Sequence, residues 1–318
     1  MTTQRKVLVT GGAGFIGSHV AEAYVARGDR VWVLDNLSSG KRTNVPAGAE
    51  LIHMDIGDPS VGALFDEVGF DLVNHHAAQI DVRISVADPA RDATTNLLGL
   101  LNLTEAAIRT GTRRFIFVSS GGVVYGEPEL IPTPERAPKD PRSPYGVTKL
   151  TGEYYLNYYR KERGLEYVAL RYSNVYGPRQ DPHGEAGVVA IFSQRLQDKV
   201  PLTIFGDGEQ TRDYVYVKDV VSANLRVSDL ALEGNEMDDV AFNVGTGVGT
   251  SVNRLADLLE EVAEVHPGRE YRGARVGELR HSTLDSSQLR ETGWAPRFAI
   301  RDGLRETYEH IAAARVAG

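Results

Sequence analysis

Two residues near the middle of the chain have the types and the spacing to move a proton. Tyr145 and Lys149 stand four positions apart in the segment YGVTK, so they share one face if that segment is helical. A tyrosine with its ordinary pKa near ~10 is a poor base at neutral pH, but a lysine ammonium beside it favours the phenolate. The pair predicts acid–base chemistry on an alcohol or a ketone. The alternative is that both are ordinary residues of an amphipathic helix.

A glycine-rich turn at the start of the chain supports the chemical interpretation. Gly11, Gly14 and Gly17 follow the apolar run Lys6–Thr10 and precede a helical pattern, which is the context that a dinucleotide-binding turn requires. Glycine lets the backbone approach a pyrophosphate, and the N–H groups of the helix N-terminus can bind its oxygens. Asp35 ends the next apolar run, where a carboxylate accepts ribose hydroxyls and repels a 2′-phosphate. Together these signals predict hydride transfer with NAD as the cofactor.

Two further segments follow predicted strands at places where a cofactor would pass. Asp55 and Ile56 follow the third strand, where a side chain can meet an adenine, and the segment His75-His76-Ala77-Ala78-Gln79 follows the fourth. The adjacent histidines raise the possibility of a metal site. However, neighbouring strand residues point to opposite faces, and neither an HExxH motif nor a carboxylate cluster accompanies them. We therefore expect packed histidines and no metal.

The composition excludes several classes of protein. The 318 residues include no cysteine, so disulfides, thiolate nucleophiles and cysteine–zinc sites are ruled out. The net charge of −8 argues against a general nucleic-acid binder. No apolar run approaches the ~18 residues of a membrane span, and the start of the chain has no signal-peptide core. We expect a cytoplasmic enzyme with a small-molecule substrate and neither a membrane nor a nucleic-acid partner.

Strand and helix patterns alternate along the first part of the chain. The expected strands are Lys6–Thr10, Arg30–Asp35, Glu50–Met54, Leu72–His75, Arg114–Ser119 and Tyr167–Arg171, and the expected helices include Ile16–Arg27, Asp92–Thr110 and Pro144–Arg163. Nearly continuous apolar strands are typical of a parallel sheet that is covered on both faces. The alternation implies right-handed βαβ units. The predicted fold class is α/β, a doubly wound parallel sheet of the Rossmann type.

The regular alternation stops after residue 173. The stretch 174–208 is rich in Gly, Pro and Asp, and it contains one expected helix at Val188–Gln197. A strand at Val240–Val244 is expected to return to the main sheet. We therefore expect an NAD-binding domain at 1–173 that 217–247 rejoins, and a smaller, interleaved C-terminal substrate lobe made of 174–216 and 248–318.

Several segments together resemble one enzyme family. They are Thr10–His19, Asp35–Gly40, Ser119–Gly126 (SSGGVVYG), Ser143–Lys149, Leu170–Gly177 (LRYSNVYG), Phe205–Val217 and Phe242–Gly247. In these segments the chain is similar to nucleotide-sugar epimerases of the extended short-chain dehydrogenase/reductase superfamily, and most similar to UDP-glucose (UDP-galactose) 4-epimerases. The resemblance implies an NAD-dependent isomerase of galactose metabolism. Such an enzyme inverts C4 of a UDP-hexose, with N-acetylated forms included, through a 4-keto intermediate.

The resemblance also implies roles for individual residues. Tyr145 would take the proton of the C4 hydroxyl while hydride passes to NAD, with Lys149, Ser119 and Ser120 beside it. The implied cofactor contacts are Gly11, Gly14, Phe15, Ile16, Gly17, Asp35, Asn36, Ser38, Gly40, Asp55, Ile56, His76, Ala77, Ala78, Gln79, Asn96, Ser119, Tyr145, Lys149 and Tyr172. The implied substrate contacts are Gly121, Tyr145, Asn174, Val188, Thr203, Phe205, Arg212, Arg275, Glu278 and Ser282.

Among the substrate contacts, the two arginines would neutralise the diphosphate. Asn174 would contact the diphosphate or the sugar, Phe205 would line the uracil pocket, and Glu278 would bind the uridine ribose. Ser282 would leave room for an N-acetyl group, unless His281 fills that space.

One position departs from the family pattern. Members usually carry Ser or Thr three residues before V-Y-G, bonded to the sugar oxygen at C4, and here that residue is Gly121. Ser119, Ser120, a water molecule or Tyr145 alone would have to replace it. The segment Gly121-Gly122-Val123 also lacks the acids that dehydratases and decarboxylases carry there. An epimerase is therefore favoured over an NAD-dependent nucleotide-sugar dehydratase or decarboxylase, a UDP-glucuronate 4-epimerase, and a non-catalytic NAD-sensing protein.

Two helical patterns carry more apolar and aromatic residues than one buried stripe requires. They are Leu97, Leu98, Leu100, Leu101 and Leu103 in the first, and Tyr154, Tyr155, Tyr158 and Tyr159 in the second. In related epimerases the equivalent helices of two subunits pair as a four-helix bundle. We therefore expect a homodimer; the alternative is that all these residues face the sheet.

Overall fold

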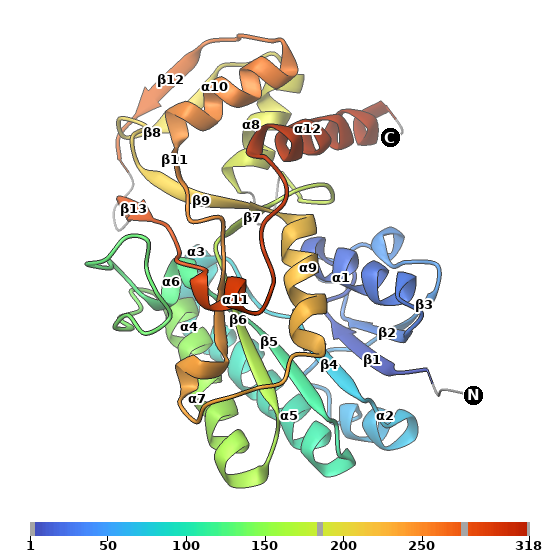
Figure 1. The fold of residues 1–318 in the computed structure, drawn as a ribbon. Helices are drawn as coiled ribbons and strands as arrows, with labels where there is room; N and C mark the ends of the chain where they lie inside the picture. Colours follow the sequence, from blue (N-terminus) through green and yellow to red (C-terminus); the bar gives the residue numbers. More distant parts are fainter. Residues whose placement is uncertain (1–3, 183–186, 275–278, 317–318) are drawn as a thin grey trace. The chain divides into compact units, whose positions relative to one another are not determined.

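The computed structural model describes residues 4–182, 187–274 and 279–316 (Figure 1). The chain folds into two compact units that alternate along the sequence. The first unit consists of Met1–Tyr125, Lys139–Arg171 and Val221–Phe242, and the second of Gly126–Pro138, Tyr172–Val220 and Asn243–Gly318. None of the helices in the described ranges is both long enough and apolar enough to span a membrane.

A seven-stranded sheet forms the centre of the first unit. Its order is β10-β6-β5-β4-β1-β2-β3, and the ladders that join β1 to β2 and β4, β2 to β3, and β4 to β5 are parallel. The strands are β1 (Lys6–Thr10), β2 (Arg30–Asp35), β3 (Ala49–His53), β4 (Leu72–His75), β5 (Arg114–Ser120), β6 (Tyr167–Tyr172) and β10 (Ala241–Val244). The order reverses on either side of β1, which confirms the predicted doubly wound sheet. The expected return of the strand near 240–244 is confirmed by β10 at one edge.

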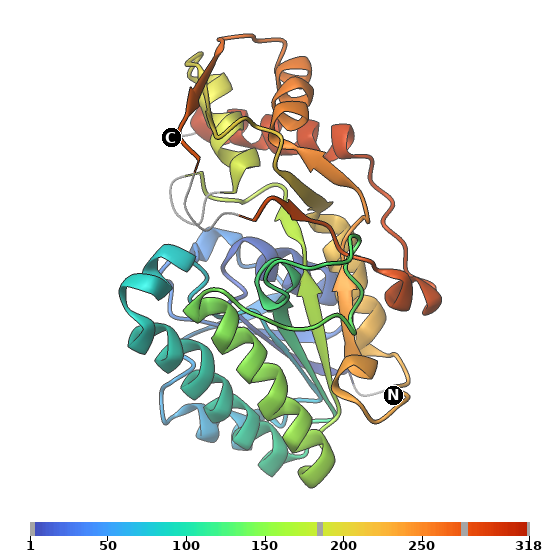
Figure 2. The ribbon, with the colours of Figure 1, turned by 90° about the vertical axis from the view of Figure 1, so that its left-hand side faces the viewer.

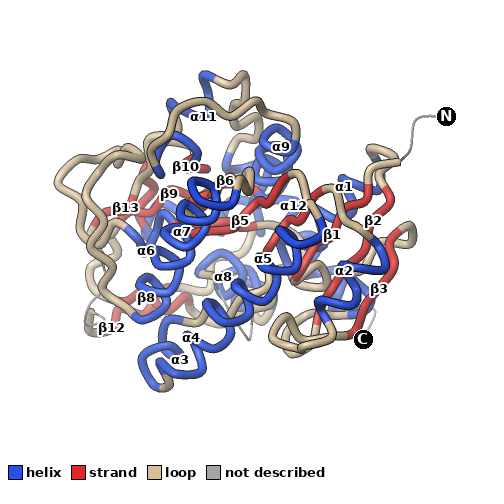
Figure 3. The backbone as a smooth tube through the Cα atoms, turned by 90° about the horizontal axis from the view of Figure 1, so that it is seen from below, coloured by secondary structure: helices blue, strands red, loops and turns tan. Residues whose placement is uncertain are grey.

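Helices cover both faces of this sheet, as the nearly continuous apolar strands predict (Figure 3). On one face, α2 (Val61–Val68), α5 (Gly99–Thr110) and α7 (Pro144–Arg163) share a buried apolar cluster with the strands. Within it, Phe65, Leu103 and Leu156 are fully buried. On the other face, α1 (Phe15–Ala26) and α9 (Val217–Ser228) are joined by the hydroxyls of Tyr24 and Ser228, 2.8 Å apart. In Figure 2, α5 and α7 lie side by side in teal and green.

Local signals explain the bounds of α7. The side chain of Ser143 accepts a hydrogen bond from the N–H of Gly146, and Pro144 occupies the first turn. Gly164, with φ +70°, ends the helix in the left-handed conformation. The helix therefore begins at Pro144 and ends at Arg163, as predicted.

The helix expected at Asp92–Thr110 is not continuous. The structure has α4 (Pro89–Ala93), a π-helical turn η2 (Thr94–Leu98) and then α5. The side-chain amide of Asn96, within η2, bonds both the N–H and the C=O of Gln79 at 2.9 Å. This pairing with a distant loop accounts for the local change in winding, and a periodic apolar pattern does not reveal it. A short helix, α3 (Val82–Ala87), precedes α4.

The second unit contains smaller sheets. In one of them β9 (Thr211–Tyr216) pairs with β11 (Gly249–Ser251), β13 (His281–Ser282) and β7 (Asn174–Tyr176), while β8 (Leu202–Phe205) pairs with β12 (Arg269–Arg272). The main helices are α8 (Val188–Gln197), α10 (Val252–Ala263) and α12 (Ile300–Val316). Residues 126–138 belong to this unit, and within it the carbonyl oxygen of Thr133 and the carboxylate of Glu135 accept hydrogen bonds from Asn243. The helix predicted at Val188–Gln197 is confirmed.

The remaining short elements are η1 (Arg42–Asn44), α6 (Gly121–Val124), η3 (Met237–Val240) and α11 (Ser287–Glu291).

Candidate active site

The glycine-rich turn joins β1 to α1 in a form that requires glycine at two positions. Gly11 has a φ of +66°, and a Cβ there would lie 2.6 Å from a backbone nitrogen of the loop after β4. A Cβ on Gly17 would collide with the carbonyl oxygen of Gly11. Gly14 occupies the N-cap position of α1, and among the described residues no side chain accepts a capping hydrogen bond there. The N–H groups of Phe15 and Ile16 open the helix, so the turn fits a pyrophosphate.

Asp35 lies at the end of β2, beside this turn. The residue is 7% exposed, and its two side-chain oxygens accept hydrogen bonds from the N–H groups of Ala13 at 3.0 Å and Leu37 at 2.8 Å. A Cβ on Gly40 would lie 2.9 Å from Asp35 Oδ1, so a glycine is needed for this close packing. The carboxylate is thus held next to the turn, where the ribose of a dinucleotide is expected.

The predicted adenosine contacts are joined at the carboxyl ends of β2 and β3. The side-chain nitrogen of Asn36 donates to Asp55 Oδ2 at 2.7 Å, and the N–H of Ser38 donates to Asn36 Oδ1 at 3.0 Å. Ile56 is buried, and a Cβ on Gly99 would lie 2.6 Å from its Cδ1. The structure therefore brings these residues to one edge of the sheet, where doubly wound folds bind nucleotides.

The two adjacent histidines are held as neutral side chains. His75 is buried, its Nδ1 lies 2.7 Å from Thr10 Oγ1, and its ring stacks on Phe117. Burial, with the Lys149 charge adding to it, lowers the pKa of His75 well below its usual value and that of His76 to about 3. Within the described ranges, no group of three His, Cys, Asp or Glu side chains could hold a metal ion.

Tyr145 and Lys149 lie in the first two turns of α7, on one face. Lys149 Nζ is 5.8 Å from the centroid of the Tyr145 ring and donates to the carbonyl oxygen of Val118 at 2.8 Å. Burial lowers the pKa of Lys149 to about 8, against the opposing effect of the negative charges of Asp92 and Glu153. The lysine therefore keeps its ammonium at neutral pH, close enough to favour a phenolate on the tyrosine.

The structure distinguishes the two serines that were candidates to replace the missing hydroxyl. Ser119 is buried, and its Oγ donates to Glu153 Oε1 at 2.5 Å. Ser120 follows it in β5, so its side chain points to the opposite face. Gly121 then opens α6, whose backbone is right-handed. Ser120 is therefore the better candidate for a contact with substrate.

Glu153, the partner of Ser119, belongs to a cluster of buried charges that the sequence did not predict. The side chains of Glu153 and Arg171 are fully buried and form a two-pronged ion pair, with Arg171 Nη2 at 2.6 Å from Glu153 Oε2. Arg171 also donates to the hydroxyl of Tyr125 at 3.0 Å and to Asp238 at 2.8 Å. The sequence signal for this cluster is Arg171 itself. It lies inside the apolar strand Tyr167–Tyr172, and a buried charge requires a partner.

The predicted contacts after β4 are tied to other segments. The N–H of Ala77 donates to Thr10 Oγ1 at 3.2 Å, and Ala78 follows in the same loop. Asn96 is buried, and its amide holds Gln79. Asn96 therefore shapes this loop through protein contacts.

In the second unit the predicted substrate contacts are distributed over several elements. Asn174 is exposed in β7, Val188 begins α8, Thr203 and Phe205 are half-buried in β8, and Arg212 lies in β9. Tyr172 is buried at the end of β6. Arg275 and Glu278 lie outside the described residues.

Ser282 occupies β13 next to Arg212 and is 9% exposed. His281 points to the other face of the strand, where its Nδ1 lies 2.9 Å from Thr211 Oγ1. It therefore does not fill the space beside Ser282.

Known proteins resemble this chain in sequence and fold over almost their whole length. The chain is 44% identical over 310 residues to UDP-glucose 4-epimerase of Mycolicibacterium smegmatis, covering 96% of this chain and 97% of that one. It matches the crystal structure of UDP-glucose 4-epimerase with UDP-glucose from Thermotoga maritima with a TM-score of 0.93 and 47% identity, over 98% and 99% of the two chains. The Thermus thermophilus UDP-glucose 4-epimerase in complex with NAD matches with a TM-score of 0.90 and 45% identity, over 97% and 99%.

The family comparison agrees with these matches. A family model described as the NAD dependent epimerase/dehydratase family matches residues 7–245, a range that contains the glycine turn, Asp35, Tyr145 and Lys149. The resemblance inferred from the motifs is thereby confirmed, and so is NAD as the cofactor. The chain belongs to the NAD-dependent epimerase/dehydratase family.

Proposed function

We propose that this chain is an epimerase that inverts C4 of a UDP-hexose, interconverting UDP-glucose and UDP-galactose through a 4-keto sugar. The observation that carries the proposal is the Tyr145–Lys149 pair on one face of α7, in a chain that also has the glycine turn and Asp35. The names of the relatives support the same activity. NAD, when bound, supplies the acceptor and donor of hydride.

The chain's own residues would transfer the proton and bind the cofactor. The Tyr145 phenolate, which the Lys149 ammonium stabilises, accepts the proton of the C4 hydroxyl and later returns it to the ketone oxygen. Ser120 bonds the C4 oxygen in place of the hydroxyl missing at Gly121. The N–H groups at the start of α1 bind the pyrophosphate, and Asp35 binds the adenosine ribose. Residues 1–173 and 217–247 would thus serve the cofactor.

Residues 174–216 and 248–318 would bind the UDP group. Asn174 and Arg212 are suited to the diphosphate, since amide and guanidinium groups donate to phosphate oxygens. Thr203 and Phe205 are suited to the base. A firm hold on UDP and a loose hold on the sugar would let the 4-keto sugar turn before hydride returns. Ser282, a small residue, pairs with Arg212 in the β13–β9 ladder, which favours N-acetylated hexosamines as additional substrates.

Incubation of the purified protein with UDP-glucose, followed by chromatography of the nucleotide sugars, tests the proposal. UDP-galactose is the expected product. A 4-keto-6-deoxy product from UDP-glucose, or carbon dioxide and a pentose nucleotide from UDP-glucuronate, would indicate a dehydratase or a decarboxylase instead. The segment Gly121-Gly122-Val123 argues against both, because it lacks the acids that dehydratases and decarboxylases carry there. No turnover of any UDP-hexose would contradict the proposal.

We also propose that the protein is a cytoplasmic homodimer acting in galactose metabolism. Leu100, Leu103 and Tyr159 face the core, but four residues of the same helical segments remain exposed: Leu98, Tyr154, Tyr155 and Tyr158, by 60%, 57%, 41% and 52%. A cluster of this kind on one set of helices favours a protein partner. The cytoplasm fits a chain without cysteine.

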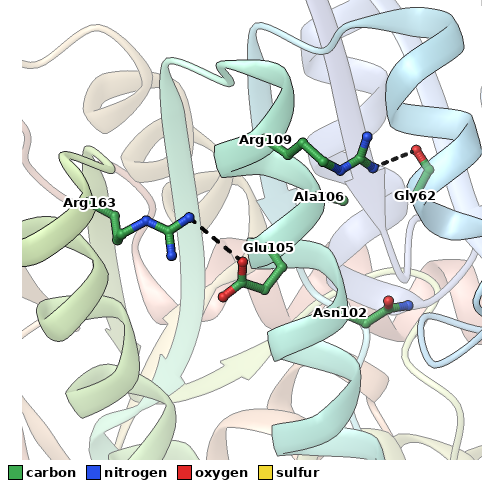
Figure 4. Close-up of a pocket in the computed structure, with 6 residues that line it drawn as sticks. All are labelled: Gly62, Asn102, Glu105, Ala106, Arg109 and Arg163. Atoms are coloured by element: carbon green, nitrogen blue, oxygen red, sulfur yellow. Dashed lines mark hydrogen bonds and ion pairs between the residues drawn. The ribbon is translucent and has the colours of Figure 1, made fainter.

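Other exposed parts of these helices are polar. There a hollow is lined by Gly62, Asn102, Glu105, Ala106, Arg109 and Arg163, and Arg109 donates to the Gly62 carbonyl oxygen at 3.1 Å (Figure 4). We therefore expect Leu98 and the three exposed tyrosines to carry the contact between subunits. Light scattering that gives a 34.8 kDa monomer throughout a dilution series would reject the dimer.

A further inference from the structure

A fully buried carboxylate lies close to the candidate catalytic pair and has no role in the account so far. Asp92, in α4, has 0% exposure. Its Oδ2 accepts the hydroxyl of Thr148 at 2.7 Å, and its Oδ1 accepts the side-chain nitrogens of Gln79 at 2.9 Å and Asn96 at 3.1 Å. A buried carboxylate is costly unless such donors satisfy it. Asp92 is satisfied by donors from three separate segments.

The proposed reaction requires these three segments to keep fixed positions relative to one another. Gln79 lies in the loop that follows β4, and the Asn96 side chain bonds both its N–H and its C=O. Thr148 directly precedes Lys149, and its Oγ1 also lies 3.0 Å from the carbonyl oxygen of Tyr145. Asn96 lies within the π-helical turn η2, and such turns often occur at functional sites.

We propose that Asp92 is a positioning residue, which holds the first turns of α7, with Tyr145 and Lys149, in fixed register with the cofactor-facing loop His76–Gln79. The proposal rests on the proposed function to the extent that this pair and this loop serve catalysis. Asp92 acts through Thr148 and Gln79. Its carboxylate takes no part in the proposed chemistry itself.

The charges around Lys149 are consistent with this role. The ammonium is influenced by Asp92 from α4, by Glu153 from its own helix, and by His75 and His76 from the end of β4. The histidines are neutral at pH 7, so the two carboxylates are the charges that oppose the effect of burial on the pKa of Lys149. Asp92 therefore favours the protonated lysine in addition to holding its helix.

Two threonines allow a matched test. Thr148 and Thr104 are both buried helical residues with satisfied hydroxyls, but that of Thr104 donates only to the carbonyl oxygen of Leu100, at 2.8 Å, as far as its described contacts extend. Thr148→Val removes the link to Asp92, Thr148→Ser retains it, and Thr104→Val removes a comparable hydroxyl away from the site. Each variant is measured without substrate, by amide hydrogen exchange at Gln79 and Lys149 and by the Kd for NAD.

We expect Thr148→Val to accelerate exchange at both amides by about tenfold, the effect of losing one buried hydrogen bond. We expect a similar rise in the Kd for NAD. Thr148→Ser should remain close to the parent, and Thr104→Val should leave both measurements unchanged even if its Tm falls. Asp92→Asn should behave like the parent in exchange, because an amide at that position can accept from Gln79 and donate to Thr148.

Equal exchange and equal NAD affinity in Thr148→Val and Thr104→Val would overturn the proposal, since the link would then be an ordinary part of the core. Failure of the proposed function gives a different result. In that case the parent would convert no UDP-hexose, while the exchange and NAD effects of Thr148→Val would still separate it from Thr104→Val.

Discussion

Replacing Lys149 by methionine should make the protein more stable and inactive at the same time. The side chain of Lys149 is buried, and its pKa falls from 10.5 to about 8. Since each pKa unit corresponds to about 1.4 kcal/mol, the buried ammonium costs about 3 kcal/mol of folding free energy at pH 7. Methionine avoids that cost but loses the charge-assisted hydrogen bond to the Val118 carbonyl oxygen, worth about 2 kcal/mol. The expected net gain in the free energy of unfolding is about 1 kcal/mol.

The gain in the free energy of unfolding should decrease as the pH rises. The pKa of Lys149 is lower in the folded than in the unfolded state, so between pH 8 and 10.5 the folded parent binds fewer protons than the unfolded parent. The stability contributed by this group therefore rises with pH across that window. The methionine variant has no such titration, so its advantage is full below pH 8 and disappears as the pH approaches 10.5.

Urea unfolding at pH 7 and pH 10 measures this difference, and a steady-state epimerase assay measures the loss of turnover. Lys161→Met is the matched control, because Lys161 is an exposed lysine of the same helix and its replacement should have little effect on stability. The reasoning would be refuted if Lys149→Met were less stable than the parent at pH 7, or if its gain were the same at pH 10. Retained turnover would refute the role of the ammonium.

Three further substitutions test other parts of the site. Gly121→Ser should preserve or raise turnover with no change in Tm, since Gly121 begins a right-handed helix; lower turnover at an unchanged Tm would contradict this. Ser282→Tyr should reduce kcat/KM for N-acetylated substrates and leave that for UDP-glucose unchanged, and a parent that turns over only the plain sugars would reject the argument from pocket size. Glu153→Ala should lower the free energy of unfolding by about 3–5 kcal/mol, because Arg171 loses its main partner, and a loss under about 1 kcal/mol would show that Asp238 alone suffices.

The elements that the sequence predicted well are those with local signals. Helix α7 has a serine cap, a proline in its first turn and a left-handed glycine at its end, and each acts within a few residues. The central strands are uniformly apolar because both faces of the sheet are covered. The glycine turn could be recognised because the positive φ of Gly11 and the close packing at Gly17 exclude other residues.

The features that the sequence did not predict depend on partners far along the chain. The π-helical turn follows from the pairing of Asn96 with a loop 17 residues earlier. The two adjacent serines differ in role because Glu153, 34 residues after Ser119, accepts the hydrogen bond of the Ser119 hydroxyl. Asp92 looked like the ordinary start of an amphipathic helix, and its burial becomes apparent only when Gln79 and Thr148 are placed beside it.

The most direct test of the proposed reaction follows the hydrogen at C4. The parent protein is incubated in ordinary water with UDP-glucose that carries deuterium at C4, and the UDP-galactose formed is analysed by mass spectrometry and NMR, with Tyr145→Phe as the inactive control. If hydride leaves C4 and returns to the opposite face within one turnover, the product keeps its deuterium at C4, and the control forms no product. A product with solvent hydrogen at C4, or undiminished turnover in Tyr145→Phe, would contradict the mechanism.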